Sequence, residues 1–107
     1  MERGQIVVAA APGDFGKPRP MLVVQTNIAD ESISVIVCPI TSEIRDAGQV
    51  RLTLDPDPVN GLQARSQVML DKITTLHVRR IGKAIGRATP EQMAEASRIL
   101  AVLLGIV

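Results

Sequence analysis

The chain has 107 residues, a formal net charge of +1, one cysteine, one phenylalanine and neither tyrosine nor tryptophan. This charge balance excludes broad electrostatic binding to duplex DNA, and the near-absence of aromatic side chains excludes recognition of RNA by a row of stacking rings. A chain of this length typically forms one domain, so we expect a single domain over residues 1–107.

The N-terminus predicts neither a signal peptide nor a membrane anchor. The segment MERGQIVV is charged and lacks the apolar stretch of a signal peptide. The sequence also contains no run of about 18 apolar residues that would predict a membrane span. We therefore expect a cytoplasmic protein with no membrane contact.

The single cysteine and the single histidine limit the chemistry further. Cys38 lies in the apolar run SVIVCPI, and we expect it to be buried, because a catalytic thiol needs a histidine beside it and the chain has only His77. No His or Cys lies three or four residues from His77, so the sequence predicts no metal site and no cofactor.

The first half of the chain predicts three strands. Residues 5–11 (QIVVAAA) predict the first, and a loop rich in proline and glycine follows at 11–20. The segments at 21–26 (MLVVQT) and 32–40 (SISVIVCPI) are apolar without alternation, which predicts strands that are buried on both faces. Turn-forming residues separate these two strands.

The second half predicts further strands and then a helix. Residues 49–55 and 66–73 alternate between apolar and polar, which predicts half-exposed strands, and 81–88 predicts a short last strand. The period then changes to that of a helix over 89–105. Strands followed by one helix predict a mainly β fold, with a small curved sheet or barrel and the helix packed on it.

The predicted helix begins with a capping sequence. Thr89 suits the N-cap, Pro90 the first turn, and Gln92 completes a capping box. One apolar stripe comprises Met93, Ala96, Leu100, Leu103 and Leu104. Apolar side chains continue past this stripe, so the helix either packs only on its own sheet or also forms a dimer interface; the additional residues are Ala101, Val102, Ile106 and Val107.

Polar side chains at the ends of the predicted strands are the candidate site. Arg19 stands between two prolines before an apolar strand, and the others are Thr41, Ser42, Arg45 and Asp71. Each also has a structural interpretation as a turn cap, a surface ion pair or a solvated charge.

Six segments, in order along nearly the whole chain, resemble the MazF/PemK family of toxins: MERGQIVV, GKPRPMLVVQ, VCPITSEIRD, GLQARSQVMLDKITTL, HVRRIG and IGRATPEQMAEASRIL. The resemblance implies an SH3-like barrel of antiparallel strands (CcdB/PemK-type) with a C-terminal helix, and a homodimer. It also implies a cognate antitoxin, whose disordered acidic segment folds on the toxin. The implied activity is metal-independent, sequence-specific cleavage of single-stranded RNA, in which the 2′-hydroxyl attacks to leave a 2′,3′-cyclic phosphate and a 5′-hydroxyl.

The same resemblance suggests roles for individual residues. Arg19 would stabilise the charge on the phosphorane and move a proton, and Thr41 would donate a hydrogen bond to a non-bridging oxygen. Asp71 matches an aspartate that acts as the base in part of the family. The candidate RNA contacts are Lys17, Ser42, Arg45, Arg79, Arg80 and Arg87. We expect Arg51 to be a solvated charge and His77 to lie at the surface.

Two departures from the family keep alternatives open. Met69 stands where members with the aspartate base carry an arginine, so the pair Arg19 and Thr41 is favoured. The GDFG loop before Arg19 is shorter than usual. These features leave open an inactive relative that binds RNA or antitoxin. A CcdB-like gyrase poison is the other alternative, although the C-terminus LLGIV contains no tryptophan.

Overall fold

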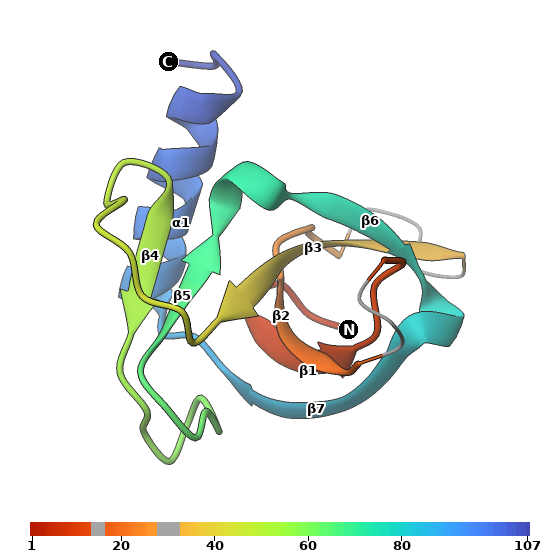
Figure 1. Cartoon of the computed structure of the whole chain (residues 1–107). Coiled ribbons are helices and arrows are strands. Elements are labelled where there is room, and N and C mark those ends of the chain that lie inside the picture. Colours follow the sequence, from red (N-terminus) through yellow and green to blue (C-terminus); the bar gives the residue numbers. More distant parts are fainter. Residues whose placement is uncertain (14–16, 28–32) are drawn as a thin grey trace.

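The computed structural model describes residues 1–13, 17–27 and 33–107 (Figure 1). The described residues form a seven-stranded antiparallel sheet with the order β4-β5-β3-β2-β1-β7, in which β6 pairs with β3. The predicted fold class, mainly β with a C-terminal helix, is confirmed. The elements are β1 (Gln5–Ala9), β2 (Arg19–Val23), β3 (Ser34–Thr41), β4 (Arg51–Leu54), β5 (Ser66–Met69), the 3₁₀ turn η1 (Leu70–Lys72), β6 (Thr74–His77), the 3₁₀ turn η2 (Val78–Arg80), β7 (Ile81–Arg87) and α1 (Pro90–Leu103).

Strand β3 organises the sheet because both of its edges are paired. One edge pairs with β2, and the other pairs with β6 along Ser34–Val37 and with β5 at Ile40 and Thr41. Strand β6 continues through η2 into β7, which pairs with β1. The sheet therefore curls round into a small barrel, with α1 beside β4 and β5 (Figure 1).

The strands β1, β2 and β3 are buried on both faces. Ile6, Leu22 and Cys38 belong to a cluster that includes the buried residues of α1, whereas Val7 and Met21 belong to a second cluster with Leu76 of β6. Neighbouring residues of a strand point to opposite faces, so two buried faces require an apolar run without alternation. This is the pattern that predicted buried strands at 21–26 and 32–40.

The start of α1 agrees with the predicted capping box. The Gln92 N–H donates to Thr89 Oγ1 at 3.1 Å, and the Thr89 N–H donates to Gln92 Oε1 at 2.8 Å. The N–H groups at the start of a helix have no partner within the helix. Here two of them are hydrogen-bonded to side chains. Among the residues that the structure describes, no helix combines the length and the hydropathy that crossing a membrane requires.

The buried face of α1 differs from the predicted stripe. Ala96 and Leu100 are buried as expected, together with Ile99, which the stripe omitted. Leu103 and Leu104 are 40% and 58% exposed, because the end of the helix projects beyond the sheet (Figure 1). These two residues of the predicted stripe therefore lie outside the core.

The strand expected over 66–73 is shorter than predicted, and two predicted loops lie largely outside the described residues. The strand expected over 66–73 ends at Met69, where the chain turns into η1, and residues 74–77 form β6, which the sequence did not predict. Only Leu76 of β6 is buried, so the strand carries little apolar signal. Most of the GDFG loop and of the turn at 27–32 lies outside the described residues, which omit 14–16 and 28–32.

The loop between β4 and β5 is built around a buried asparagine side chain. Asn60 is 1% exposed. Its Oδ1 accepts hydrogen bonds from the N–H groups of Asp57 (3.1 Å) and Leu62 (3.0 Å), and its Nδ2 donates to the Asp55 carbonyl oxygen (2.8 Å). The Asn60 N–H in turn donates to Asp57 Oδ1 at 2.7 Å. A buried amide whose oxygen and nitrogen are both hydrogen-bonded fixes the loop conformation.

Two glycines let this loop pack directly on β7. Gly61 has a φ of +69°, and a Cβ atom there would lie 2.1 Å from the Ile85 carbonyl oxygen. A Cβ atom on Gly86 would lie 2.3 Å from the Val59 carbonyl oxygen. Backbone approaches of this closeness exclude any side chain, so both positions require glycine.

We predict that Gly61→Ala destabilises the protein by about 2–5 kcal/mol. Alanine would have to adopt the left-handed conformation of this position, and its Cβ atom would clash with β7. Gly48→Ala is the matched control, since a Cβ atom at Gly48 meets no atom within 4 Å. Urea unfolding of both variants measures the difference. Equal stabilities for the two variants would contradict the packing of this loop on β7.

We also predict a poorly reactive thiol. Burial, with a smaller contribution from the charge of Asp71, raises the pKa of the Cys38 thiol to about 12. We expect a disulfide reagent at pH 8 to react with the folded protein at least about a hundredfold more slowly than with the urea-unfolded chain. Because the folded-state pKa exceeds that of the unfolded thiol, the resulting stabilisation is present at neutral pH and is lost as the pH rises from about 9 toward 12. Rapid labelling of the folded protein would contradict the prediction.

Candidate functional site

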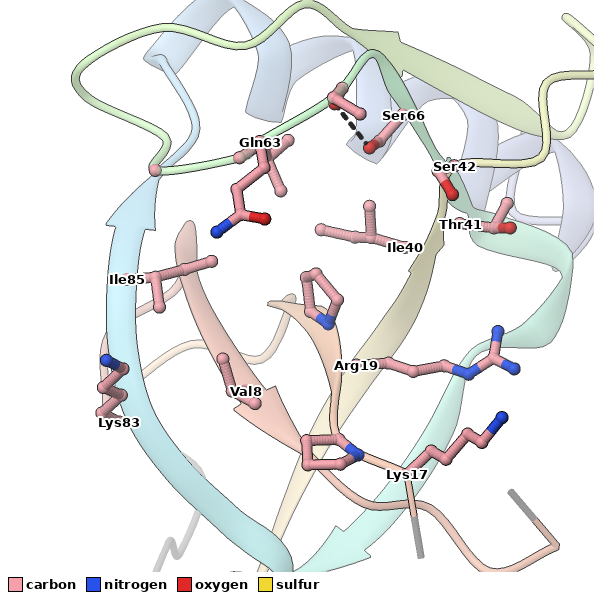
Figure 2. Close-up of a pocket in the computed structure, with 15 residues that line it drawn as sticks. Val8, Lys17, Arg19, Ile40, Thr41, Ser42, Gln63, Ser66, Lys83 and Ile85 are labelled. Atoms are coloured by element: carbon pink, nitrogen blue, oxygen red, sulfur yellow. Dashed lines mark hydrogen bonds between the residues drawn. The ribbon is translucent and has the colours of Figure 1, made fainter. Parts of the chain in front are cut away.

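A cleft of about 730 Å³ opens where the start of β2, the end of β3, the β4–β5 loop and β7 meet (Figure 2). Its walls combine cationic, hydroxyl and amide groups with aliphatic side chains and prolines. The lining residues are Val8, Lys17, Pro18, Arg19, Pro20, Ile40, Thr41, Ser42, Gly61, Leu62, Gln63, Ala64, Ser66, Lys83 and Ile85. The cleft therefore gathers residues from five separate parts of the sequence.

The register of β2 against β3 brings Arg19 and Thr41 together. Met21 pairs with Pro39 and Leu22 with Cys38 in this antiparallel ladder. Each step back along β2 corresponds to one step forward along β3, so extension of the register places Arg19 opposite Thr41. Opposed residues in an antiparallel pair direct their side chains to the same face. The two residues that the sequence analysis favoured thus lie at one edge of the cleft.

Two of the cationic side chains, Arg19 and Lys17, lie on the same side of the cleft as Thr41 and Ser42 (Figure 2). Figure 2 shows Arg19 and Lys17 extending in the same direction, with Thr41 and Ser42 on that side. Arg19 is exposed and is the first residue of β2, where it pairs with Ala9 of β1. The flanking prolines restrict its backbone, which lowers the entropy lost when the guanidinium binds an anion.

The Thr41 hydroxyl has a defined orientation. Its Oγ1 accepts a hydrogen bond from the Glu43 N–H at 3.1 Å. The hydroxyl proton points elsewhere, because a hydroxyl can accept one bond while donating another. Thr41 can therefore donate to a ligand in the cleft while its oxygen stays anchored to the backbone.

The loop after Thr41 is held by the buried side chain of Gln67, which pairs with Thr41 in the β3–β5 ladder and is 4% exposed. Gln67 Oε1 accepts from the Arg45 N–H at 3.0 Å and from Arg51 Nη1 at 2.9 Å. Its Nε2 donates to the Arg45 carbonyl oxygen at 2.9 Å and to Thr53 Oγ1 at 3.2 Å. One side chain thus binds both backbone groups of Arg45 and fixes the loop beside the cleft.

Two arginines of this region have structural contacts. Arg51 donates to the Glu43 carbonyl oxygen at 3.0 Å as well as to Gln67, so the expectation that Arg51 is only a solvated charge was wrong. The Arg45 guanidinium pairs with the Glu43 carboxylate at 2.6 Å, and this hydrogen bond lowers the pKa of Glu43. Arg45, a predicted RNA contact, lies on the loop that borders the cleft and is absent from the lining.

The remaining predicted site residues lie away from the cleft lining. Asp71 is exposed on η1, and Arg79 and Arg80 are exposed on η2, where Arg80 Nη1 donates to the Ala10 carbonyl oxygen at 3.3 Å. Arg87 borders a smaller cavity of about 280 Å³ near the start of α1. The structure therefore brings together Lys17, Arg19, Thr41 and Ser42, and it does not bring these other residues to the same cleft.

Sequence reasoning missed several lining residues. Lys83 and Ile85 share one face of β7, as residues two apart in a strand do, and they border the cleft opposite Arg19 (Figure 2). Gln63 and Ser66 come from the β4–β5 loop and the first residue of β5. The alternation of side chains along β7 could have indicated that Lys83 and Ile85 share a face. Only the packing of the β4–β5 loop on β7 brings them into one cleft with Gln63 and Ser66.

Comparison with known proteins identifies the family. A family model described as PemK-like, MazF-like toxin of type II toxin–antitoxin system matches residues 2–104. A protein of Mycolicibacterium smegmatis named probable endoribonuclease MazF is 40% identical over 107 residues, which cover 99% of this chain and 98% of that protein.

Solved structures agree with this result. An endoribonuclease from a mycobacterial species, in complex with its cognate antitoxin, superposes with a TM-score of 0.82 at 25% identity and covers 100% of this chain and 97% of that one. The Mycobacterium tuberculosis toxin MazF-mt6 gives a TM-score of 0.79 at 25% identity, with 94% and 96% covered. The chain therefore belongs to the family of PemK-like, MazF-like toxins of type II toxin–antitoxin systems.

Proposed function

We propose that this chain is a toxin that acts as a sequence-specific endoribonuclease on single-stranded RNA in the cytoplasm, without a metal. The main observation in support is that Arg19 and Thr41 line one cleft together with Lys17 and Ser42. A guanidinium, an ammonium and hydroxyl donors together suit a phosphodiester, because they provide charge and directed hydrogen bonds to its oxygens. The name of the relative in Mycolicibacterium smegmatis supports the same activity.

The proposed reaction is an internal transesterification. The ribose 2′-oxygen forms a bond to phosphorus while the bond from phosphorus to the 5′-oxygen breaks, which leaves a 2′,3′-cyclic phosphate and a 5′-hydroxyl. A base removes the proton of the 2′-hydroxyl, and the leaving 5′-oxygen gains a proton. Negative charge develops on the oxygens of the phosphorane as these bonds form and break. Hydrogen-bond donors that already face those oxygens therefore lower the barrier.

Two residues are assigned to the phosphorane. The Arg19 guanidinium would bind its non-bridging oxygens and provide the proton for the leaving oxygen, as the family resemblance suggests. The Thr41 hydroxyl would donate to a non-bridging oxygen, since its own oxygen is held by the Glu43 N–H. Asp71 stays a candidate base by resemblance alone, because it does not line the cleft.

The proposal includes a homodimer and an antitoxin. The end of α1 exposes an apolar surface that continues beyond the core: Val102, Leu103, Leu104, Ile106 and Val107. Surfaces of this kind favour burial against another protein. A two-fold axis would bring two clefts into one RNA-binding surface. The antitoxin is proposed because a similar endoribonuclease was solved in complex with its cognate antitoxin. The acidic segment of the antitoxin would form ion pairs with the arginines outside the cleft.

We predict that the wild-type protein cuts a long RNA at discrete sites in the presence of EDTA and leaves 5′-hydroxyl ends. Arg19→Ala should lower the cleavage rate by at least about a hundredfold, because it removes a donor to the developing charge. Arg19→Lys should recover only part of the rate, because an ammonium lacks the planar fork of a guanidinium. End-labelling of the fragments identifies the chemistry.

Arg98→Ala is the matched control for charge, because Arg98 is exposed on α1 and pairs with Glu95. Asp71→Asn in the same assay tests the candidate base: a loss comparable to that of Arg19→Ala would support this role. RNA that stays intact at high protein concentration, or cleavage that is unchanged in Arg19→Ala, would overturn the proposed mechanism.

We further predict that Gln67→Leu lowers the cleavage rate about tenfold and destabilises the fold by about 1–3 kcal/mol, because buried hydrogen-bonding groups lose their partner and the loop after Thr41 is released. Gln49→Leu is the control, since Gln49 is exposed on the same loop. Single-turnover cleavage at a temperature where both variants are folded separates the two effects. Cleavage at the wild-type rate in folded Gln67→Leu would show that the hydrogen bonds of Gln67 to the loop after Thr41 do not affect the site.

A further inference from the structure

We propose that Gln63 reads a base of the RNA through hydrogen bonds and so determines part of the cleavage sequence. This inference rests on the proposed function, since it assigns a substrate contact to the same cleft. It concerns the part of the cleft that lies away from Arg19 and Thr41, for which neither the sequence nor the family resemblance suggested a role.

The two ends of the cleft are separated by an aliphatic floor. Figure 2 shows Val8, Ile40 and Ile85 between Lys83 at one end and Arg19 and Lys17 at the other. Ile40 is 2% exposed and belongs to the main core cluster, so this floor is fixed from below. An apolar surface beside a phosphate-binding edge can pack against the face of a base.

The floor follows from the alternation of side chains along the strands. Arg19 and Thr41 point to one face of their strands, so the neighbouring residues Pro20 and Ile40 point to the other. Val8 of β1 pairs with Pro20 and therefore lies on the same face as these two. A nucleotide whose phosphate contacts the strand ends can thus rest its base on the adjoining aliphatic face.

The described lining of the cleft contains no aromatic ring, so stacking cannot select a base there. Sequence-specific recognition of a single strand then depends on hydrogen bonds to the base edges. Gln63 provides the required group, because its side chain extends into the cleft toward the floor (Figure 2). A carboxamide offers a donor and an acceptor side by side, so it can pair with a base edge that presents an adjacent donor and acceptor.

The backbone that carries Gln63 is held firmly. The buried Asn60 side chain bonds the N–H of Leu62, the residue before Gln63, and Gly61 packs directly against the Ile85 backbone. On the other side, Ser66 Oγ donates to the Ala64 carbonyl oxygen at 2.8 Å. A side chain on a fixed loop loses less conformational entropy on binding, and its amide meets a base in a constant position.

The test compares the sequence preferences of wild-type protein, Gln63→Ala and Gln63→Glu. Cut sites are first mapped on one long RNA, and short RNAs with a single cut site are then made with each of the four bases at every position beside it. Gln63→Ala should reduce discrimination at one position about tenfold, with little change at the others. Gln63→Glu keeps two acceptors but lacks the amide donor, so it should change the base preference at that same position and leave the others unchanged.

Gln49→Glu is the matched control for the added charge, because Gln49 is exposed and outside the cleft lining. If wild-type protein cuts RNA and both Gln63 variants keep its preferences at every position, the inference is overturned while the proposed function stands. A uniform slowing by Gln63→Ala at all sites, without loss of discrimination, overturns it as well. If wild-type protein cuts no RNA, the proposed function itself fails and this inference fails with it.

Discussion

The pairing of β2 with β3 is the constraint on which the rest of the structure depends. This register buries both faces of the two strands and brings Arg19 and Thr41 to the same cleft where the strands leave the core. A shift by one residue would exchange the two buried faces and move Arg19 away from Thr41. Stability and the geometry of the candidate site are therefore set by the same interaction.

Two buried amide side chains extend this constraint to the loops. Gln67 binds both backbone groups of Arg45 beside Thr41, and Asn60 organises the loop that carries Gln63. Both loops border the cleft, and neither contributes a long apolar segment to the core. Polar groups buried with complete hydrogen bonding specify one conformation where hydrophobic packing alone would permit several. The cleft thus has a rigid framework despite being formed largely by loops and strand ends.

The sequence predicted those features whose signal is local. Thr89 and Gln92 formed the expected capping box, and the uninterrupted apolar runs around Leu22 and Cys38 became strands buried on both faces. Strand β6 escaped prediction because its pairing with β3, and not its own alternation, makes it a strand. Lys83 and Gln63 escaped because they reach the cleft through contacts between segments far apart in sequence. The resemblance to the family suggested Arg19 and Thr41, whereas composition alone left their roles open.

The Asn60–Gly61 step also affects the chemical lifetime of the protein. In a disordered chain, the nitrogen of a glycine after asparagine readily attacks the side-chain amide, and the resulting ring opens to aspartate or isoaspartate. Here the Asn60 amide is buried and bonded on both of its atoms, and the Gly61 N–H donates to the Asp57 carbonyl oxygen at 3.3 Å. Folding thus protects Asn60 from deamidation. Molecules that spend long periods unfolded would acquire a negative charge at position 60, at the centre of this loop. The amount of deamidated protein would therefore measure how long the molecules had been unfolded, and the modification would lie in one wall of the cleft.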